Sequence, residues 1–114
     1  MNITGHWKYS EDFEFGESIG NVKLIQVEDS VYGEFSFTEK VENDYEIEVF
    51  EKVKGDITEG KVLLKSIEVK AKEKGRVVDY IPNNFELHLV SENKLVGSTF
   101  DSEEVCGVFT LERL

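Results

Sequence analysis

The stretch Ile3-Thr4-Gly5-His6-Trp7-Lys8-Tyr9 holds the only tryptophan of the chain, and its alternation decides the fold. Residues two apart in a strand face the same side, so aromatic and small residues share one face here and polar residues the other. The predicted inner face is Ile3, Gly5, Trp7 and Tyr9, and the outer face is Thr4, His6 and Lys8. A glycine beside a large ring lets a sheet bend sharply while the ring covers the gap. The stretch therefore indicates a small sheet that closes on itself.

The same pairing of glycine and aromatic residue returns later in the chain. Gly33-Glu34-Phe35 and Gly107-Val108-Phe109 repeat it, and Gly97-Ser98-Thr99-Phe100 is a looser version. Between these stretches, short alternating segments are separated by turn residues, and no segment of about twelve residues has helical spacing of apolar positions. About nine strands are expected. They cover residues 3–9, 22–28, 31–38, 45–57, 62–71, 76–81, 85–90, 95–100 and 105–114.

Evenly spaced strands with hairpin-length turns predict an all-β fold. We expect an up-and-down antiparallel meander that closes into a small, lipocalin-like barrel of about eight or nine strands. An immunoglobulin-like sandwich is the competing interpretation, but the chain lacks its Cys-Trp-Cys core and its turns are too short for the crossovers. Residues 1–114 are expected to form one domain, because 114 residues can bury a core of their own.

Two places depart from simple alternation. Residues 10–20 have no clean period, and we expect either a long loop or a ragged extension of the first strand, which forms a flap over one end of the fold. Tyr45 to Ile57 alternates, which turns Glu51 inward unless a bulge falls at Phe50–Glu51, and such a bulge is the favoured interpretation. A second bulge is expected between Leu64 and Ile67, where the phase of the next strand changes.

The formal charge of -11 comes from 24 acidic and 13 basic residues. Nucleic acids and anionic membrane surfaces are poor partners for such a chain, because both require a basic patch. Outward Glu and Lys positions favour solubility. The apolar runs are too short for a membrane span or a signal-peptide core. We expect a soluble, cytoplasmic protein, the alternative being a secreted protein whose signal has been removed.

Gly5-His6-Trp7 near the start and Phe109-Thr110-Leu111-Glu112-Arg113 at the end resemble the ends of calycin-type barrels, which include lipocalins, fatty-acid-binding proteins and avidins. The resemblance implies that Arg113 packs across Trp7 as a cation–π stack that seals one end of the barrel, beside Gly5. The hairpin 92–100 is also similar to those of such barrels. The middle of the chain departs from the pattern, with no Thr-Asp-Tyr signature and no pair of cysteines. The resemblance supports the architecture and identifies no subfamily.

Residues for catalysis are sparse, and we expect no enzyme. His6 and His88 are predicted on outer faces without a third ligand, so no metal and no cofactor are expected. The single cysteine, Cys106, is predicted to face away from the core. If Glu51 does face inward, its burial would raise its pKa, and it could anchor a ligand or act as an acid or base.

The barrel interior is the remaining candidate site. Its many inward aromatic residues favour a filled core, with a shallow pocket at the end beneath residues 10–20. The candidate ligand-binding residues, in the interior or at its mouth, are Tyr9, Phe13, Phe15, Phe35, Phe37, Tyr45, Glu51, Phe85 and Phe100. Trp7 and Phe109 are also expected inside.

Three functions remain open from the sequence. The leading hypothesis is a non-enzymatic barrel that binds a small apolar or amphipathic molecule at its open end. The alternative is a protein-interaction module that uses an acidic outer face and exposed aromatic residues such as Tyr32 or Phe50. A third class, an isomerase or cyclase, would need Glu51 as an inward acid or base.

Overall fold

The computed structural model describes residues 2–13, 15–100 and 105–114, and these residues form strands and turns without a helix. The predicted strand 76–81 is shorter than expected and ends at Val78. The predicted turn at 101–104 lies outside the described residues. The strands are β1 (Gly5–Phe13), β2 (Gly16–Val27), β3 (Ser30–Val41), β4 (Tyr45–Thr58), β5 (Lys61–Glu73), β6 (Arg76–Val78), β7 (Asn84–Ser91), β8 (Lys94–Phe100) and β9 (Val105–Arg113).

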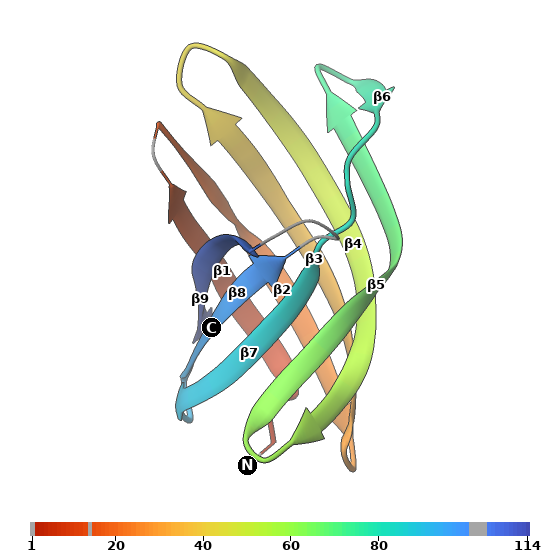
Figure 1. Ribbon diagram of the computed structural model, residues 1–114, viewed down its shortest axis with the longest axis vertical. Coiled ribbons are helices and arrows are strands. Elements are labelled where there is room, and N and C mark those ends of the chain that lie inside the picture. Colours follow the sequence, from red (N-terminus) through yellow and green to blue (C-terminus); the bar gives the residue numbers. More distant parts are fainter. Residues whose placement is uncertain (1, 14, 101–104) are drawn as a thin grey trace.

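Eight of the nine strands form a closed antiparallel barrel (Figure 1). They pair in the order β4-β3-β2-β1-β9-β8-β7-β5, and β4 also pairs with β5, which closes the ring. The extra strand, β6, pairs only with the far end of β5 at Ala71–Glu73. The hairpins β1–β2, β3–β4 and β5–β6 point to one end, here called the open end, and the N-terminus lies at the other, the closed end. The up-and-down barrel predicted from alternation is confirmed.

Of the two interpretations of residues 10–20, the long loop is wrong and the extension of the first strand is correct in part, because β1 runs to Phe13 and β2 already begins at Gly16. Their pairing runs without interruption from Gly5 opposite Leu24 to Phe13 opposite Gly16. The inward positions in this part of the hairpin are mostly polar or small, as at Glu11 and Ser18, so the hydrophobic alternation fades while the backbone pairing persists. The flap over the barrel is therefore replaced by two strands that extend its wall.

One of the two predicted bulges is present. Lys52 pairs with Glu68 and Val53 pairs with Ser66, which leaves Ile67 of β5 without a partner, as the phase change between Leu64 and Ile67 predicted. The bulge favoured at Phe50–Glu51 is wrong, because β4 pairs with β3 without a break. The extra residue lies on the partner strand, so the alternation of β4 is preserved and Glu51 faces inward with 0% of its surface exposed.

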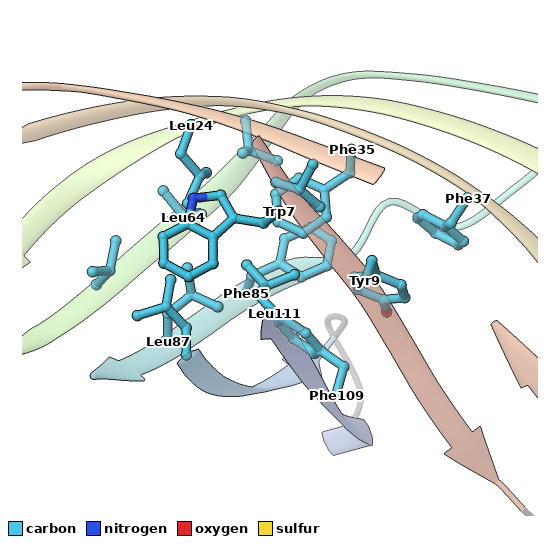
Figure 2. Close-up of a cluster of buried hydrophobic side chains, with 14 of the residues drawn as sticks. Trp7, Tyr9, Leu24, Phe35, Phe37, Leu64, Phe85, Leu87, Phe109 and Leu111 are labelled. Atoms are coloured by element: carbon cyan, nitrogen blue, oxygen red, sulfur yellow. The ribbon is translucent and has the colours of Figure 1, made fainter. Parts of the chain in front are cut away.

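Tightly packed apolar side chains fill the interior below the open end (Figure 2). Aliphatic residues gather around Trp7, which is 0% exposed, so the prediction that it is buried is confirmed. An aromatic layer follows. Phe35 and Phe85 stack with ring centroids 4.2 Å apart, and Tyr9 stacks on Phe37 at 5.1 Å and on Phe109 at 5.0 Å. Since each such ring buries about 150–250 Å², this layer supports the prediction of a filled core.

Arg113 seals the closed end. Its guanidinium lies 4.3 Å from the centroid of the Trp7 ring, so the stack implied by the calycin resemblance is present. The same group donates hydrogen bonds to the backbone carbonyls of Asn2, Thr4 and Glu92, at 3.2, 2.9 and 3.1 Å. Gly5 has a φ of 148°, and a Cβ there would lie 2.8 Å from the guanidinium. The glycine is therefore required both by its backbone angle and by the space the arginine occupies.

Replacement of Arg113 by lysine is expected to lower the free energy of unfolding by about 2 kcal/mol, because a lysine cannot stack its planar fork on Trp7 and reach three carbonyls together. Urea unfolding followed by tryptophan emission measures this. The matched control is Arg76→Lys, since Arg76 is exposed on β6 and its change is expected to cost less than about 0.5 kcal/mol. Equal stabilities of the two variants would contradict a sealing role for Arg113.

Candidate functional site

A hollow of about 410 Å³ lies at the open end of the barrel, above the aromatic layer, and is here called the mouth pocket. Its walls come from inward positions of β1, β3, β4 and β8 and from the segment 79–83, which descends from β6 to β7 (Figure 1). The lining residues are Glu11, Phe13, Glu39, Tyr45, Ile47, Asp79, Tyr80, Ile81, Asn83 and Thr99. The inner face thus changes from aliphatic at the closed end, through aromatic, to mixed polar and aromatic at the mouth.

Glu39 is the centre of the polar contacts in the mouth pocket. The Tyr45 hydroxyl donates to its Oε2 at 2.7 Å, and the Tyr80 hydroxyl donates to its Oε1 at 3.0 Å. The Asn83 amide lies 3.5 Å from the Tyr80 hydroxyl. Burial, together with the Glu39 carboxylate, raises the pKa of Tyr45 and of Tyr80 well above the usual range. Both tyrosines therefore remain neutral donors that hold the carboxylate in place.

A second carboxylate, Glu11, faces the same space. The Tyr9 hydroxyl donates to its Oε1 at 3.1 Å. Burial raises the pKa of Glu11, the Tyr9 hydrogen bond partly opposes that rise, and the charge of Glu39 adds to it. Ser18 of β2 pairs with both glutamates in the sheet, so the inner face carries a row of Glu11, Ser18 and Glu39. The Ser18 hydroxyl is buried and has no hydrogen-bond partner among the described residues.

Glu51 lies deeper, between Phe35 of β3 and Val69 of β5 on the inner face. Neither of its carboxylate oxygens has a hydrogen-bond partner in the described part of the chain. Burial raises the pKa of Glu51 to about 7, and Ser66 and Asn83 are close enough to moderate that rise. Glu51 is not among the residues that line the mouth pocket.

The predicted site residues fall into three groups. Phe13 and Tyr45 line the mouth pocket, whereas four aromatic residues belong to the packed core beneath it, namely Tyr9, Phe35, Phe37 and Phe85. Phe15 is 71% exposed at the β1–β2 turn, so it lies neither in the interior nor at the mouth. Phe100 was also expected inside, but Leu95, Gly97 and Thr99 take the inward positions of β8 and turn Phe100 outward.

The sequence-based reasoning missed Glu11, Glu39, Tyr80 and Asn83. Glu11 lies two residues after Tyr9, and Glu39 lies two residues after Phe37. Both therefore fall on inward positions, and continuing the alternation along each strand could have found them. Tyr80 and Asn83 could not be found this way, because they lie on an irregular segment whose path depends on where β5 stops pairing with β7.

Tyr32, one of the exposed aromatic residues expected for a protein-interaction module, lies among side chains of both charge signs, with Glu34 and Asp56 beside the lysines. Tyr32 is 50% exposed, and hollows beside it are lined by Lys23, Lys52, Lys54 and Lys65 as well as by apolar side chains. Phe50 is half-buried. A larger hollow of about 700 Å³ lies over solvent-facing side chains of β2 to β5, including Lys70 and Lys72. The surroundings of Tyr32 are thus mixed in charge rather than acidic.

His6 and His88 are both exposed on outer faces of the barrel. The Cys106 side chain lies outside the described residues. Across the described ranges, no group of three or more His, Cys, Asp or Glu side chains is arranged to hold a metal ion. No helix of a length and apolarity that could span a bilayer occurs in the described part of the chain.

No protein-family model and no curated protein matches the sequence. Solved structures do match the fold. The redesigned β-barrel mFAP1, bound to DFHBI, superposes with a TM-score of 0.64 at 12% identity, covering 97% of this chain and 94% of that one. The redesigned barrel mFAP0, also bound to DFHBI, gives 0.63 at 13%, covering 97% and 98%. A fluorescence-activating β-barrel designed de novo gives 0.58 at 10%, covering 99% and 94%. At these identities the likeness concerns the fold, and the chain is a small closed antiparallel β-barrel similar to these designed barrels.

Proposed function

We propose that this protein is a non-enzymatic, calycin-like barrel that binds one small molecule in its mouth pocket. The observation that carries the proposal is the mouth pocket itself, a hollow of about 410 Å³ lined from inward strand positions above a filled core. Small barrels of about eight strands can hold one small ligand in this position. The ligand-bound designed barrels support small-molecule binding in general, and the Trp7–Arg113 closure supports the calycin resemblance.

The lining favours an amphipathic ligand over a wholly apolar one. Phe13, Ile47 and Ile81 offer apolar surface, while Glu39 and Asn83 offer polar atoms. Binding pockets of this kind combine apolar walls with a few placed polar groups that fix orientation. The packed aromatic layer confines the ligand to the mouth, so the ligand we propose is compact rather than long-chained.

Native mass spectrometry of the freshly purified protein, compared with its denatured mass, tests the proposal. We expect a stoichiometric extra mass that is lost on denaturation. In the variant Ile47→Trp, a larger ring fills the mouth pocket, and we expect at least a tenfold loss of the bound fraction.

The matched control is Ile57→Trp, which adds the same ring on the same strand at the opposite end of the barrel. It is expected to retain the ligand. A bare protein mass in the unmodified protein, or equal retention by both folded variants, would contradict binding in the mouth pocket.

A further inference from the structure

The mouth pocket is charged with one sign only. Three of its lining residues, Glu11, Glu39 and Asp79, are acidic, and none is lysine, arginine or histidine. A ligand with a negative charge would add to this field, whereas a positive charge would offset it. The net charge of -11 acts in the same direction, because it raises the local concentration of cations at a concave site.

The inner wall also contains a buried hydroxyl group that lacks a hydrogen-bond partner among the described residues. The buried Ser18 hydroxyl lies between Glu11 and Glu39 in the sheet and has no hydrogen-bond partner among the described residues. Buried polar groups in folded proteins are almost always paired, so this unpaired hydroxyl on the inner wall indicates a missing partner, although Ser18 is not itself among the residues that line the mouth pocket. A donor group that enters between the two glutamates would reach this row.

Glu39 is prepared to accept such a donor. Its two oxygens each accept one tyrosine hydroxyl, from Tyr45 and Tyr80, which fixes the carboxylate in one orientation. Each carboxylate oxygen can accept more than one hydrogen bond, so both retain capacity. Phe13, Tyr45 and Tyr80 surround the carboxylates with aromatic surface, and aromatic faces attract cations as well.

We propose that the mouth pocket takes a small organic cation, an ammonium group attached to an aromatic or short apolar group, with Glu39 as its counter-ion. This inference rests on the proposed small-molecule function and adds the ligand class. An organic ammonium fits better than a metal ion, because in the described part of the chain no three His, Cys, Asp or Glu side chains, Glu11, Glu39 and Asp79 included, lie close enough together to hold an ion, and the walls are partly apolar. The ammonium donates to Glu39 and lies beside Glu11, while the apolar group packs on Phe13 and Ile47.

Three probes of similar size separate the charge preference from binding itself. These are 2-phenylethylammonium, neutral 2-phenylethanol and anionic phenylacetate, each titrated into the millimolar range while backbone amide shifts are followed by NMR. Saturable shifts are expected at Tyr45, Tyr80 and Asn83, and none at the Trp7 indole N–H, which is buried at the closed end and donates to the Ile3 carbonyl. We expect the ammonium to bind at least tenfold more tightly than the alcohol, and the anion not to bind.

The variant Glu39→Gln removes the counter-ion while keeping the shape of the side chain. It is expected to lower the affinity for 2-phenylethylammonium at least tenfold and to change the affinity for 2-phenylethanol less than threefold. The control is Glu34→Gln, the same charge change at an exposed position of the same strand, which should leave both unchanged.

The outcomes distinguish the two proposals. If the alcohol binds as tightly as the ammonium, the cation inference is overturned while small-molecule binding stands. If the ammonium binds at its full affinity to Glu39→Gln, Glu39 is not its counter-ion. If none of the three probes gives a saturable shift at the mouth pocket, both proposals fail.

Discussion

Replacing Gly20 by alanine is expected to lower the free energy of unfolding by about 3 kcal/mol or more, because backbone atoms of the neighbouring strand leave no space for a Cβ at this residue. Gly20 lies between Tyr9 and Phe37 in the sheet, and these two rings stack 5.1 Å apart. Strands two positions apart in a flat sheet are about 9–10 Å apart, so the rings can stack only if the sheet folds inward at the strand between them.

The space at Gly20 is closed by backbone atoms. A Cβ there would overlap the Ser36 carbonyl oxygen and would lie 2.5 Å from the Phe37 Cα. This overlap can be removed only if β2 and β3 move apart. That movement breaks the hydrogen bonds between the two strands and the stack of Tyr9 on Phe37. Urea unfolding at equilibrium measures the loss of unfolding free energy. The ring-current shifts of the Tyr9 and Phe37 ring protons in NMR spectra report whether the two rings still stack.

Gly33→Ala is the matched control, since Gly33 also faces inward on a strand. The nearest atoms to a Cβ there are the ends of the Leu24 and Val53 side chains, both at 3.0 Å. Side-chain ends can shift by a few tenths of an ångström, so this change is expected to cost at most about 1 kcal/mol. If both variants lose the same stability, side-chain crowding explains the effect and the bend at Gly20 does not.

The barrel itself could be predicted from the sequence because its core-forming strands alternate cleanly. Trp7 and Phe35 lie on the faces that the pattern assigns to them, and both are fully buried. The pattern depends on apolar side chains, so it weakened where the inward side chains become polar. This is why the sequence predicts only a loop or a ragged strand extension at residues 10–20, although Glu11 lies two residues after Tyr9 and therefore faces the same side as Trp7 and Tyr9.

The candidate site was less predictable than the fold for the same physical reason. A mouth that binds a polar group must interrupt the hydrophobic alternation, and the row of Glu11, Ser18 and Glu39 does so. Tyr80 adds a contact from a segment outside the regular strands, and its partner Glu39 is 41 residues away in the sequence. Such a contact depends on how the barrel closes, which local patterns do not specify.

The alternation of residues 45–57 correctly places Glu51 on the inner face, although a bulge that turns it outward was favoured. Burying a carboxylate without a partner is unfavourable, so a bulge that turns it outward was the favoured interpretation. The structure keeps the parity and buries the group, with the bulge on β5 instead. The unfavourable energy is therefore present in the folded protein and can be measured through its dependence on pH.

The variant Glu51→Gln is expected to be more stable than the unmodified protein by about 3 kcal/mol at about pH 8, and of similar stability at about pH 4.5. Burial raises the pKa of Glu51 from 4.5 to about 7 in the folded protein. Between these values the folded state binds more protons than the unfolded state. Rising pH therefore lowers the free energy of unfolding through this window, and the loss is complete above about pH 7.

Glutamine has nearly the same shape as a protonated glutamate and does not titrate, so the variant does not undergo this loss. Urea unfolding of both proteins at about pH 5, 6, 7 and 8 gives the difference curve. Glu11, whose pKa is also raised by burial, is present in both proteins, so its contribution cancels in the difference.

Glu48→Gln is the control for the loss of one negative charge, because Glu48 is exposed on the same strand. Its difference from the unmodified protein is expected to stay within about 0.5 kcal/mol and not to vary with pH. A flat difference curve for Glu51→Gln would mean that the Glu51 carboxylate has found a partner or water in solution. A curve that rises through about pH 6 while the control stays flat would establish that the barrel carries a buried carboxyl group that is neutral in mild acid and charged, at a cost in stability, above neutrality.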